Sequence, residues 1–102
     1  MAERVKIAEK SEVPDGTGKV VTTGGRVLAL FNAGGSFHAV DNTCPHRGGP
    51  LGEGHLDGTV VTCPWHGWQF DVCTGASPHN PNASVRRVPL ELRGDEIFVL
   101  LE

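Results

Sequence analysis

Two short segments of this 102-residue chain constrain its fold more than any other feature of the sequence. The first reads Cys44-Pro45-His46-Arg47-Gly48-Gly49 and the second reads Cys63-Pro64-Trp65-His66-Gly67-Trp68. Each combines one cysteine with one histidine among glycine and proline, which are residues of turns and loops. Two sulfur and two nitrogen ligands suit zinc or an iron–sulfur cluster, and they disfavour calcium and magnesium, which bind oxygen. We therefore expect two loops that meet at one metal centre.

The spacing within the segments helps to separate zinc from an iron–sulfur cluster. One residue lies between Cys44 and His46, whereas a zinc site usually has two to four residues between its first ligands. Two irons relax this demand, because both thiolates can bind one iron and both imidazoles the other. Glycines beside each histidine let backbone N–H groups approach bridging sulfides, and the proline after each cysteine stiffens the loop. The pattern favours a cluster with two irons, and a structural zinc-binding module is the alternative.

The rest of the chain is typical of an all-β domain. No window has the apolar period of a helix, and turn signals recur about every ten residues. The predicted strands cover residues 5–8, 20–23, 26–31, 36–40, 59–62, 69–72, 85–92 and 96–101. Three stretches rich in turn residues are predicted to be mostly loop, namely 41–58, 63–68 and 74–82. We expect one antiparallel domain over residues 1–102, with a three-stranded meander and a C-terminal hairpin.

Composition and charge argue against several functions. The net charge is −3 without any basic run, so the electrostatic pattern of a nucleic-acid binder is missing. No apolar stretch approaches the about 20 residues of a membrane helix, and the charged N-terminus does not resemble a signal peptide. Three cysteines are an odd number, which argues against a disulfide framework and for a reducing compartment. We therefore expect a cytoplasmic protein that binds neither nucleic acid nor membrane.

The two segments together resemble the Rieske motif, in which Cys-x-His is followed by Cys-x-x-His, here after sixteen residues. The resemblance extends to the flanking residues, and the length and strand pattern fit a Rieske domain from end to end. It implies one [2Fe–2S] cluster, with Cys44 and Cys63 on the inner iron and His46 and His66 on the outer iron. It also implies the Rieske iron–sulfur fold, a sandwich or partial barrel of antiparallel strands with two cluster-binding loops at one end.

Three positions make the chain resemble the low-potential branch of this family. Respiratory Rieske proteins brace the cluster with a disulfide, at positions that Gly49 and Trp65 occupy here. They also bond a serine hydroxyl to a bridging sulfide, where this chain has Trp68, and loss of that bond lowers the reduction potential. The chain is therefore similar to the soluble Rieske ferredoxins of bacterial ring-hydroxylating dioxygenases. This implies an electron carrier, not an enzyme, between an NAD(P)H-dependent flavoprotein reductase and a terminal oxygenase.

A second resemblance, about as close, is to the small subunit of assimilatory NADH-dependent nitrite reductase. In that alternative the chain is a permanent [2Fe–2S] subunit, and its partner is the large subunit of that enzyme. In both cases the chain itself makes and breaks no substrate bond.

The other candidate residues have ordinary interpretations. Cys73 follows a predicted strand, and we expect a buried free thiol there and not a fifth ligand. His38, His55 and His79 are expected to be strand or surface histidines. By resemblance, His79 lies in the proline-containing loop that covers the cluster, where packing is its expected role.

The aromatic and charged residues of the two segments leave choices open. Trp65 and Trp68 are each expected either to pack in the core or to form part of a shield or docking surface at the cluster. Arg47 is expected to be exposed near the histidines, where it would steer a partner or have no special role. The small negative net charge would suit a basic patch on a partner.

Overall fold

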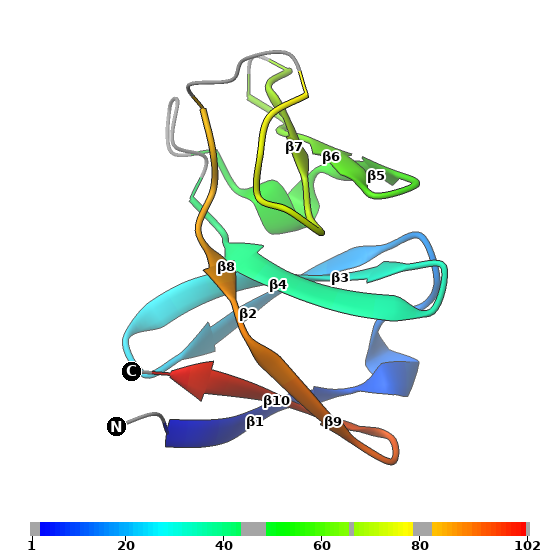
Figure 1. The fold of residues 1–102 in the computed structure, drawn as a ribbon, viewed down its shortest axis with the longest axis vertical. Helices are drawn as coiled ribbons and strands as arrows, with labels where there is room; N and C mark the ends of the chain where they lie inside the picture. The colour runs from blue at the N-terminus through cyan, green and yellow to red at the C-terminus, as the bar shows by residue number, and fades with distance from the viewer. Residues whose placement is uncertain (1–2, 44–48, 66, 79–82, 102) are drawn as a thin grey trace.

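The computed structural model describes residues 3–43, 49–65, 67–78 and 83–101. These residues form three antiparallel sheets, with strand orders β1-β10-β9, β2-β3-β4-β8 and β5-β6-β7 (Figure 1). The strands are β1 (Glu3–Glu9), β2 (Gly18–Thr23), β3 (Arg26–Ala33), β4 (Ser36–Asp41), β5 (His55–Asp57), β6 (Val60–Thr62), β7 (Gln69–Asp71), β8 (Arg87–Val88), β9 (Leu90–Arg93) and β10 (Glu96–Leu101). The helical turns η1 (Lys10–Glu12) and η2 (Leu51–Glu53) are 3-10 turns. No helix in the described ranges is long and apolar enough to span a membrane.

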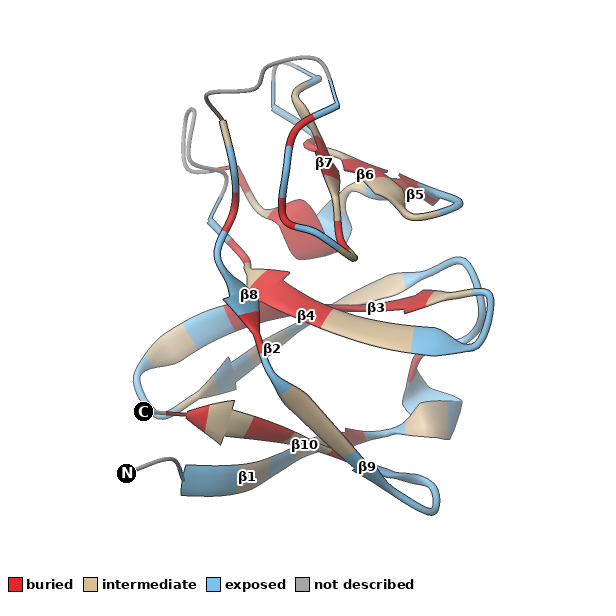
Figure 2. Ribbon diagram, viewed as in Figure 1, coloured by how far each residue is buried: buried red, intermediate tan, exposed pale blue. Residues whose placement is uncertain are grey.

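The three sheets form layers, with the β2-β3-β4-β8 sheet between the other two (Figure 1). β3 is the best example of this arrangement, because it is buried on both faces (Figure 2). Leu28 and Leu30 belong to one apolar cluster, whereas Ala29 and Phe31 belong to another. Successive side chains of a strand point to opposite faces, so a continuous apolar run is what a strand between two layers requires.

Two apolar clusters join the layers. The base core comprises Ala8, Val13, Leu28, Leu30, Ala39, Val88, Ile97, Val99 and Leu101. The loop-side core comprises Ala29, Phe31, Val40, Leu51, Leu56, Val61, Cys63, Phe70, Val72 and Val85. Burial of a Val, Leu, Ile or Phe side chain stabilises the fold by about 1.5–3 kcal/mol. The predicted ligand Cys63 belongs to the loop-side core, so packing between the middle sheet and β5-β6-β7 also positions that thiol.

Pairs of glycines form the tight turns of the middle sheet. Gly24 and Gly25 have φ values of 56° and 75°, and Gly34 and Gly35 have values of 65° and 93°. A two-residue hairpin turn of type I′ needs positive φ at both central positions, which glycine adopts without strain. These turns connect β2 to β3 and β3 to β4 in continuous antiparallel register. The predicted meander is therefore confirmed.

The structure differs from the predicted strands in three places. The strand predicted over 85–92 is divided at Pro89 into β8, which pairs with β4, and β9, which pairs with β10. Proline has no N–H to donate to a ladder. Residues 55–57, predicted as loop, form β5 and pair with β6. Residues 10–12 and 51–53 form η1 and η2, which were not predicted, because three residues are too few to show a period.

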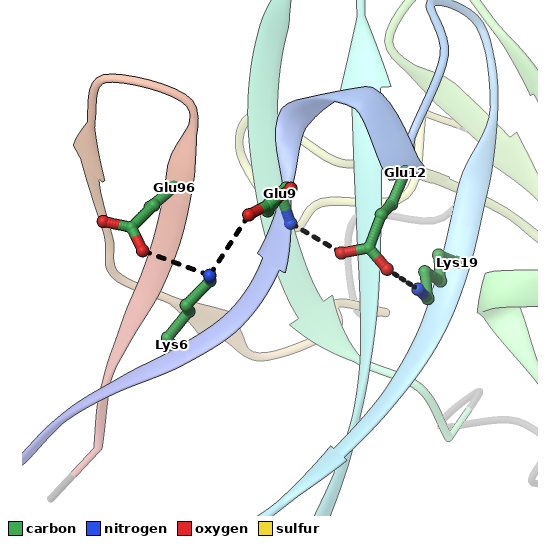
Figure 3. A network of polar contacts seen from close by, with 5 residues as sticks. All are labelled: Lys6, Glu9, Glu12, Lys19 and Glu96. Atoms are coloured by element: carbon green, nitrogen blue, oxygen red, sulfur yellow. Dashed lines mark hydrogen bonds and ion pairs between the residues drawn. The ribbon is translucent and has the colours of Figure 1, made fainter.

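A network of charged side chains joins β1, η1, β2 and β10 (Figure 3). Lys6 Nζ lies 3.1 Å from a Glu96 oxygen and 3.3 Å from a Glu9 oxygen. Lys19 Nζ lies 2.8 Å from Glu12, which also accepts the Glu9 N–H at 2.7 Å. The hydrogen bond from Lys19, and then that from the Glu9 N–H, hold the pKa of Glu12 below its usual value. Exposed ion pairs contribute little stability each, and this network has no part in the candidate site.

Candidate metal centre

The second cysteine-histidine segment is the loop of the β6–β7 hairpin. The ladder between these strands leads directly into the segment, and the Cys63 N–H extends it by donating to the Trp68 carbonyl at 2.7 Å. Gly67 has φ of 72°, a left-handed value that favours glycine. Cys63 is therefore held at the base of a short closed loop, where it is 1% exposed.

The first segment lies between the end of β4 and η2. An isolated antiparallel bridge joins Thr43 to Pro50 at its base. Asn42 accepts two further hydrogen bonds there, one on its carbonyl and one on its side chain. Both segments are thus closed at their bases by the backbone, although by different means.

The two segments meet at Gly49, which is buried. A Cβ atom placed on Gly49 would lie 2.6 Å from Cys63 Sγ and 3.0 Å from Trp65 Cβ. The backbone of the first segment therefore runs against the sulfur of a predicted ligand in the second. The 3.0 Å separation from Trp65 Cβ is shorter than the about 3.8 Å between the Cβ atoms of a disulfide-bonded pair, and neither Gly49 nor Trp65 is a cysteine.

The structure places one of the four predicted ligands, Cys63. The other three predicted ligands, Cys44, His46 and His66, lie outside the described ranges. Arg47 and His79 lie outside them as well. The convergence of the segments is consequently supported by Gly49, Cys63 and Trp65.

The two tryptophans, whose roles the sequence left open, have different environments in the structure. Trp65 is 51% exposed. Trp68 is partly buried and packs against the loop-side core, with its ring centroid 6.5 Å from that of Phe70. Core packing therefore describes Trp68, whereas Trp65 presents an aromatic surface beside the site.

A third loop reaches the same end of the molecule (Figure 1). Ala76 and Ser84 form an isolated antiparallel bridge, and the Ser77 N–H donates to the Ala83 carbonyl at 3.1 Å. These contacts join the described residues on either side of residues 79–82, which lie outside the described ranges. The predicted proline-containing loop is therefore held at its base by residues on both sides.

Cys73 follows β7 and contacts the middle sheet. Its Sγ lies 3.3 Å from His38 Nε2 on β4, and its N–H donates to Asp71 Oδ1 at 2.8 Å. The thiol forms no disulfide, as predicted, but it is partly exposed and not fully buried. His38 and His55 lie on strands, and His55 is exposed, in agreement with the ordinary roles expected for them.

The contact between Cys73 and His38 is one between neutral groups. Burial, and then the charge of Asp71, raise the pKa of the Cys73 thiol. Burial, and then the charge of Arg87, lower the pKa of His38. Among the described residues no three His, Cys, Asp or Glu side chains are grouped as a metal site, so this pair does not form a second centre there.

The described residues of the two segments and of the base of the third loop are uncharged. The ranges 49–52, 63–65, 67–69, 75–78 and 83–84 contain no acidic, basic or histidine residue. The expectation that acidic residues would meet a basic patch on a partner finds no support in these ranges. A partner that approaches them meets Trp65 and neutral backbone.

Comparisons with known sequences place the chain in a family. The model of the Rieske [2Fe-2S] domain matches residues 3–90. Ferredoxin CarAc from Metapseudomonas resinovorans is 38% identical over 101 residues, which cover 93% of this chain and 91% of that protein. The ferredoxin component of the naphthalene 1,2-dioxygenase system from Pseudomonas aeruginosa is 34% identical over 89 residues, which cover 86% of each chain.

Comparisons with solved structures agree. A chain in the complex of reduced oxygenase and oxidised ferredoxin of carbazole 1,9a-dioxygenase has a TM-score of 0.86 and 34% identity, covering 94% of this chain and 91% of that one. A putative NADH-dependent nitrite reductase small subunit from Mycobacterium tuberculosis has a TM-score of 0.90 and 24% identity, covering 100% and 97%. The second likeness shows the shared fold alone.

The chain belongs to the Rieske [2Fe–2S] family. Within that family it is a ferredoxin that carries one Rieske-type [2Fe–2S] cluster and transfers electrons, like its relatives that are ferredoxin components of oxygenase systems. The described residues fit the cluster. Cys63 offers a buried thiol, and Gly49 has no side chain to fill the space beside the Cys63 sulfur. The predicted all-β antiparallel fold is confirmed.

Proposed function

We propose that Cys44, His46, Cys63 and His66 hold the cluster, and that the chain passes single electrons from an NAD(P)H-dependent flavoprotein reductase to a terminal ring-hydroxylating oxygenase. When bound, the cluster supplies reversible one-electron chemistry. The observation that carries the proposed role is the likeness, over 94% of this chain, to a chain in a solved oxygenase–ferredoxin complex. We place the carrier in the cytoplasm, where an NAD(P)H-dependent reductase finds its reductant.

The contribution of the chain to this role is to hold the ligands in fixed positions. Cys63 is held by the hairpin ladder and by the loop-side core, and Gly49 brings the first segment against it. Ligands that are locked by packing and backbone bonds give a preorganised site. A preorganised site needs little rearrangement when an electron arrives or leaves.

Deletion of the gene in its host tests the proposed role. Cells without the chain should lose ring hydroxylation of the aromatic substrate and keep growth on nitrite as the nitrogen source, and a plasmid copy should restore hydroxylation. The opposite result, with growth on nitrite lost and hydroxylation intact, would reject the oxygenase role. It would favour the small subunit of nitrite reductase, for which the present support is the shared fold.

Trp65 offers a contact for the oxygenase. It is 51% exposed, shares a loop with Cys63, and precedes the proposed ligand His66. Tryptophan is enriched among the residues that contribute most to interfaces, because a partner that covers it buries a large apolar surface. We expect the oxygenase to cover this side chain when it docks at the cluster.

Replacement of Trp65 with alanine should weaken docking and leave the cluster unchanged. We expect the KM of the oxygenase for the reduced carrier to rise by about tenfold or more, which corresponds to about 1.4 kcal/mol or more. The reduction potential should stay at the wild-type value. Leu92→Ala is the matched control, because Leu92 is 44% exposed on β9, on a layer away from the site (Figure 1). An unchanged KM in W65A would place the docking surface elsewhere.

Replacement of His66 with cysteine tests the histidine ligands. Thiolate donates more electron density than imidazole, so a cluster that is retained should have a lower potential, shifted toward the about −400 mV of clusters with four cysteines. A redox titration followed by EPR measures this shift. His55→Cys on the exposed strand β5 is the control and should titrate like wild type. A wild-type potential in H66C would remove His66 from the ligand set.

A further inference from the structure

Asn42 is a buried amide at the point where the chain leaves the middle sheet for the first segment. It follows the last residue of β4 and is 9% exposed. Its N–H donates to the Val27 carbonyl of β3 at 3.0 Å. The residue before the loop is thus fixed to the middle sheet.

Two acceptors on Asn42 bind the chain where it returns from the first segment. The Asn42 carbonyl accepts the Leu51 N–H at 2.7 Å, and Asn42 Oδ1 accepts the Gly52 N–H at 2.8 Å. Gly52 is buried, and a Cβ on it would lie 3.0 Å from Asn42 Oδ1 and 2.6 Å from Val20 Cγ2. The close approach of Gly52 to β2 and the bonds to Asn42 therefore fix both ends of residues 43–50.

The first segment needs such a residue more than the second does. The second segment closes a hairpin, whose ladder continues through the Cys63 N–H to the Trp68 carbonyl. The first segment joins a strand to a 3-10 turn, with an isolated bridge from Thr43 to Pro50 at its base. Pro50 has no N–H to donate. The next two N–H groups, of Leu51 and Gly52, bind Asn42 in place of a ladder.

We propose that Asn42 is the positioning residue of the first ligand loop and sets how firmly that loop retains the cluster. The proposal rests on the ligand set proposed above, in which Cys44 and His46 belong to this loop. Asn42 acts through the base of the loop and not by touching the cluster. The Gly52 N–H is buried, and a buried N–H without an acceptor is costly, so a side chain without an acceptor should open the base.

Three variants of the cluster-loaded protein test the proposal. Asn42→Leu removes the acceptor at similar size, whereas Asn42→Asp keeps an oxygen at the same position. Asn32→Leu is the matched control. Asn32 is likewise buried, at 8% exposed, and its Oδ1 accepts the Gly35 N–H at 2.8 Å. Its Nδ2 also donates to the Val13 carbonyl at 2.8 Å. Because Asn32 lies near the β3–β4 turn, the control removes the same kind of accepted bond, and one donated bond more, outside the two segments.

The rate of cluster loss is measured by the decay of visible absorption in excess chelator, together with the reduced-state EPR spectrum and the melting temperature. We expect N42L to lose the cluster about tenfold faster than wild type and to broaden the EPR spectrum. N42D should return the rate to near the wild-type value. N32L should change the rate of cluster loss by less than about twofold, even if its melting temperature falls as much as that of N42L. Equal rates in N42L and N32L would overturn the proposal.

Failure of the underlying ligand set would be distinguishable from failure of the Asn42 proposal. A Cys44→Ser variant with a wild-type spectrum would remove the first segment from the site, and both proposals would fall. If N42L loses its cluster at the wild-type rate while C44S lacks the cluster, only the proposed role of Asn42 would be overturned. If N42L does not fold, Asn42→Ser, whose shorter side chain withdraws the acceptor, should show the same faster release. A wild-type rate in N42S would then overturn the proposal.

Discussion

Substitution of Gly49 with alanine should remove most of the cluster and leave the chain folded. The added Cβ would lie 2.6 Å from Cys63 Sγ and 3.0 Å from Trp65 Cβ, so the thiol or the first segment must move. Gly49 does not have a positive φ, so alanine tests crowding without backbone strain. Overpacking of a buried site costs about 1–3 kcal/mol, which a domain of this size can survive. We expect iron content, visible absorption and the reduced-state EPR signal to fall together.

Gly18→Ala is the control for crowding in general. A Cβ on Gly18 in β2 would lie 2.5 Å from Phe31 Cε1, and Gly18 also lacks a positive φ. The two variants should lose similar stability in thermal unfolding, whereas G18A should keep its iron. A full cluster content in G49A would show that the segments do not meet as closely as the structure shows. Equal iron loss in both variants would indicate general destabilisation instead of a local effect at Cys63.

Local patterns in the sequence predicted most of the strands, because the relevant forces act between near neighbours. Two glycines in succession, as at Gly24 and Gly25, specify a tight turn whatever the rest of the chain does. The apolar run of β3 predicted a strand, but its burial on both faces depends on the stacking of three layers. β5 (His55–Asp57) is a strand because it pairs with β6, and its own three residues carry no such signal.

The spacing of cysteine and histidine in each segment predicts four ligands for the candidate site. Cys63 is the one of them that lies among the described residues, and the ligand set stays a prediction. Asn42 and the crowding at Gly49 escaped prediction, because both arise from contacts across the fold, with Gly52 and with Cys63. An amide residue two positions before the first cysteine-histidine segment was the available signal. Trp65 and Trp68 looked equivalent in sequence, whereas the fold packs Trp68 partly buried against the loop-side core and leaves Trp65 exposed.

Two serine substitutions should distinguish the proposed ligand thiol, Cys63, from the other described thiol, Cys73. Cys63 is 1% exposed and lies against Gly49, whereas Cys73 lies 3.3 Å from His38 Nε2. A serine hydroxyl at 63 is a harder donor than thiolate and stays protonated at neutral pH, so it is a poor ligand for an iron–sulfur cluster. We expect C63S to be purified without the visible absorption or reduced-state EPR signal of the wild type.

Cys73→Ser should keep the wild-type spectrum and reduction potential. Burial and the charge of Asp71 raise the pKa of the Cys73 thiol, so the group that is replaced is a protonated thiol, whereas a metal ligand is a thiolate. The serine hydroxyl can donate to His38 in its place, so stability should change by less than about 1 kcal/mol in thermal unfolding. Cluster loss from C73S would make Cys73 part of the site. Cluster retention in C63S would exclude Cys63 as a ligand, and the contact with Gly49 would then be a matter of packing.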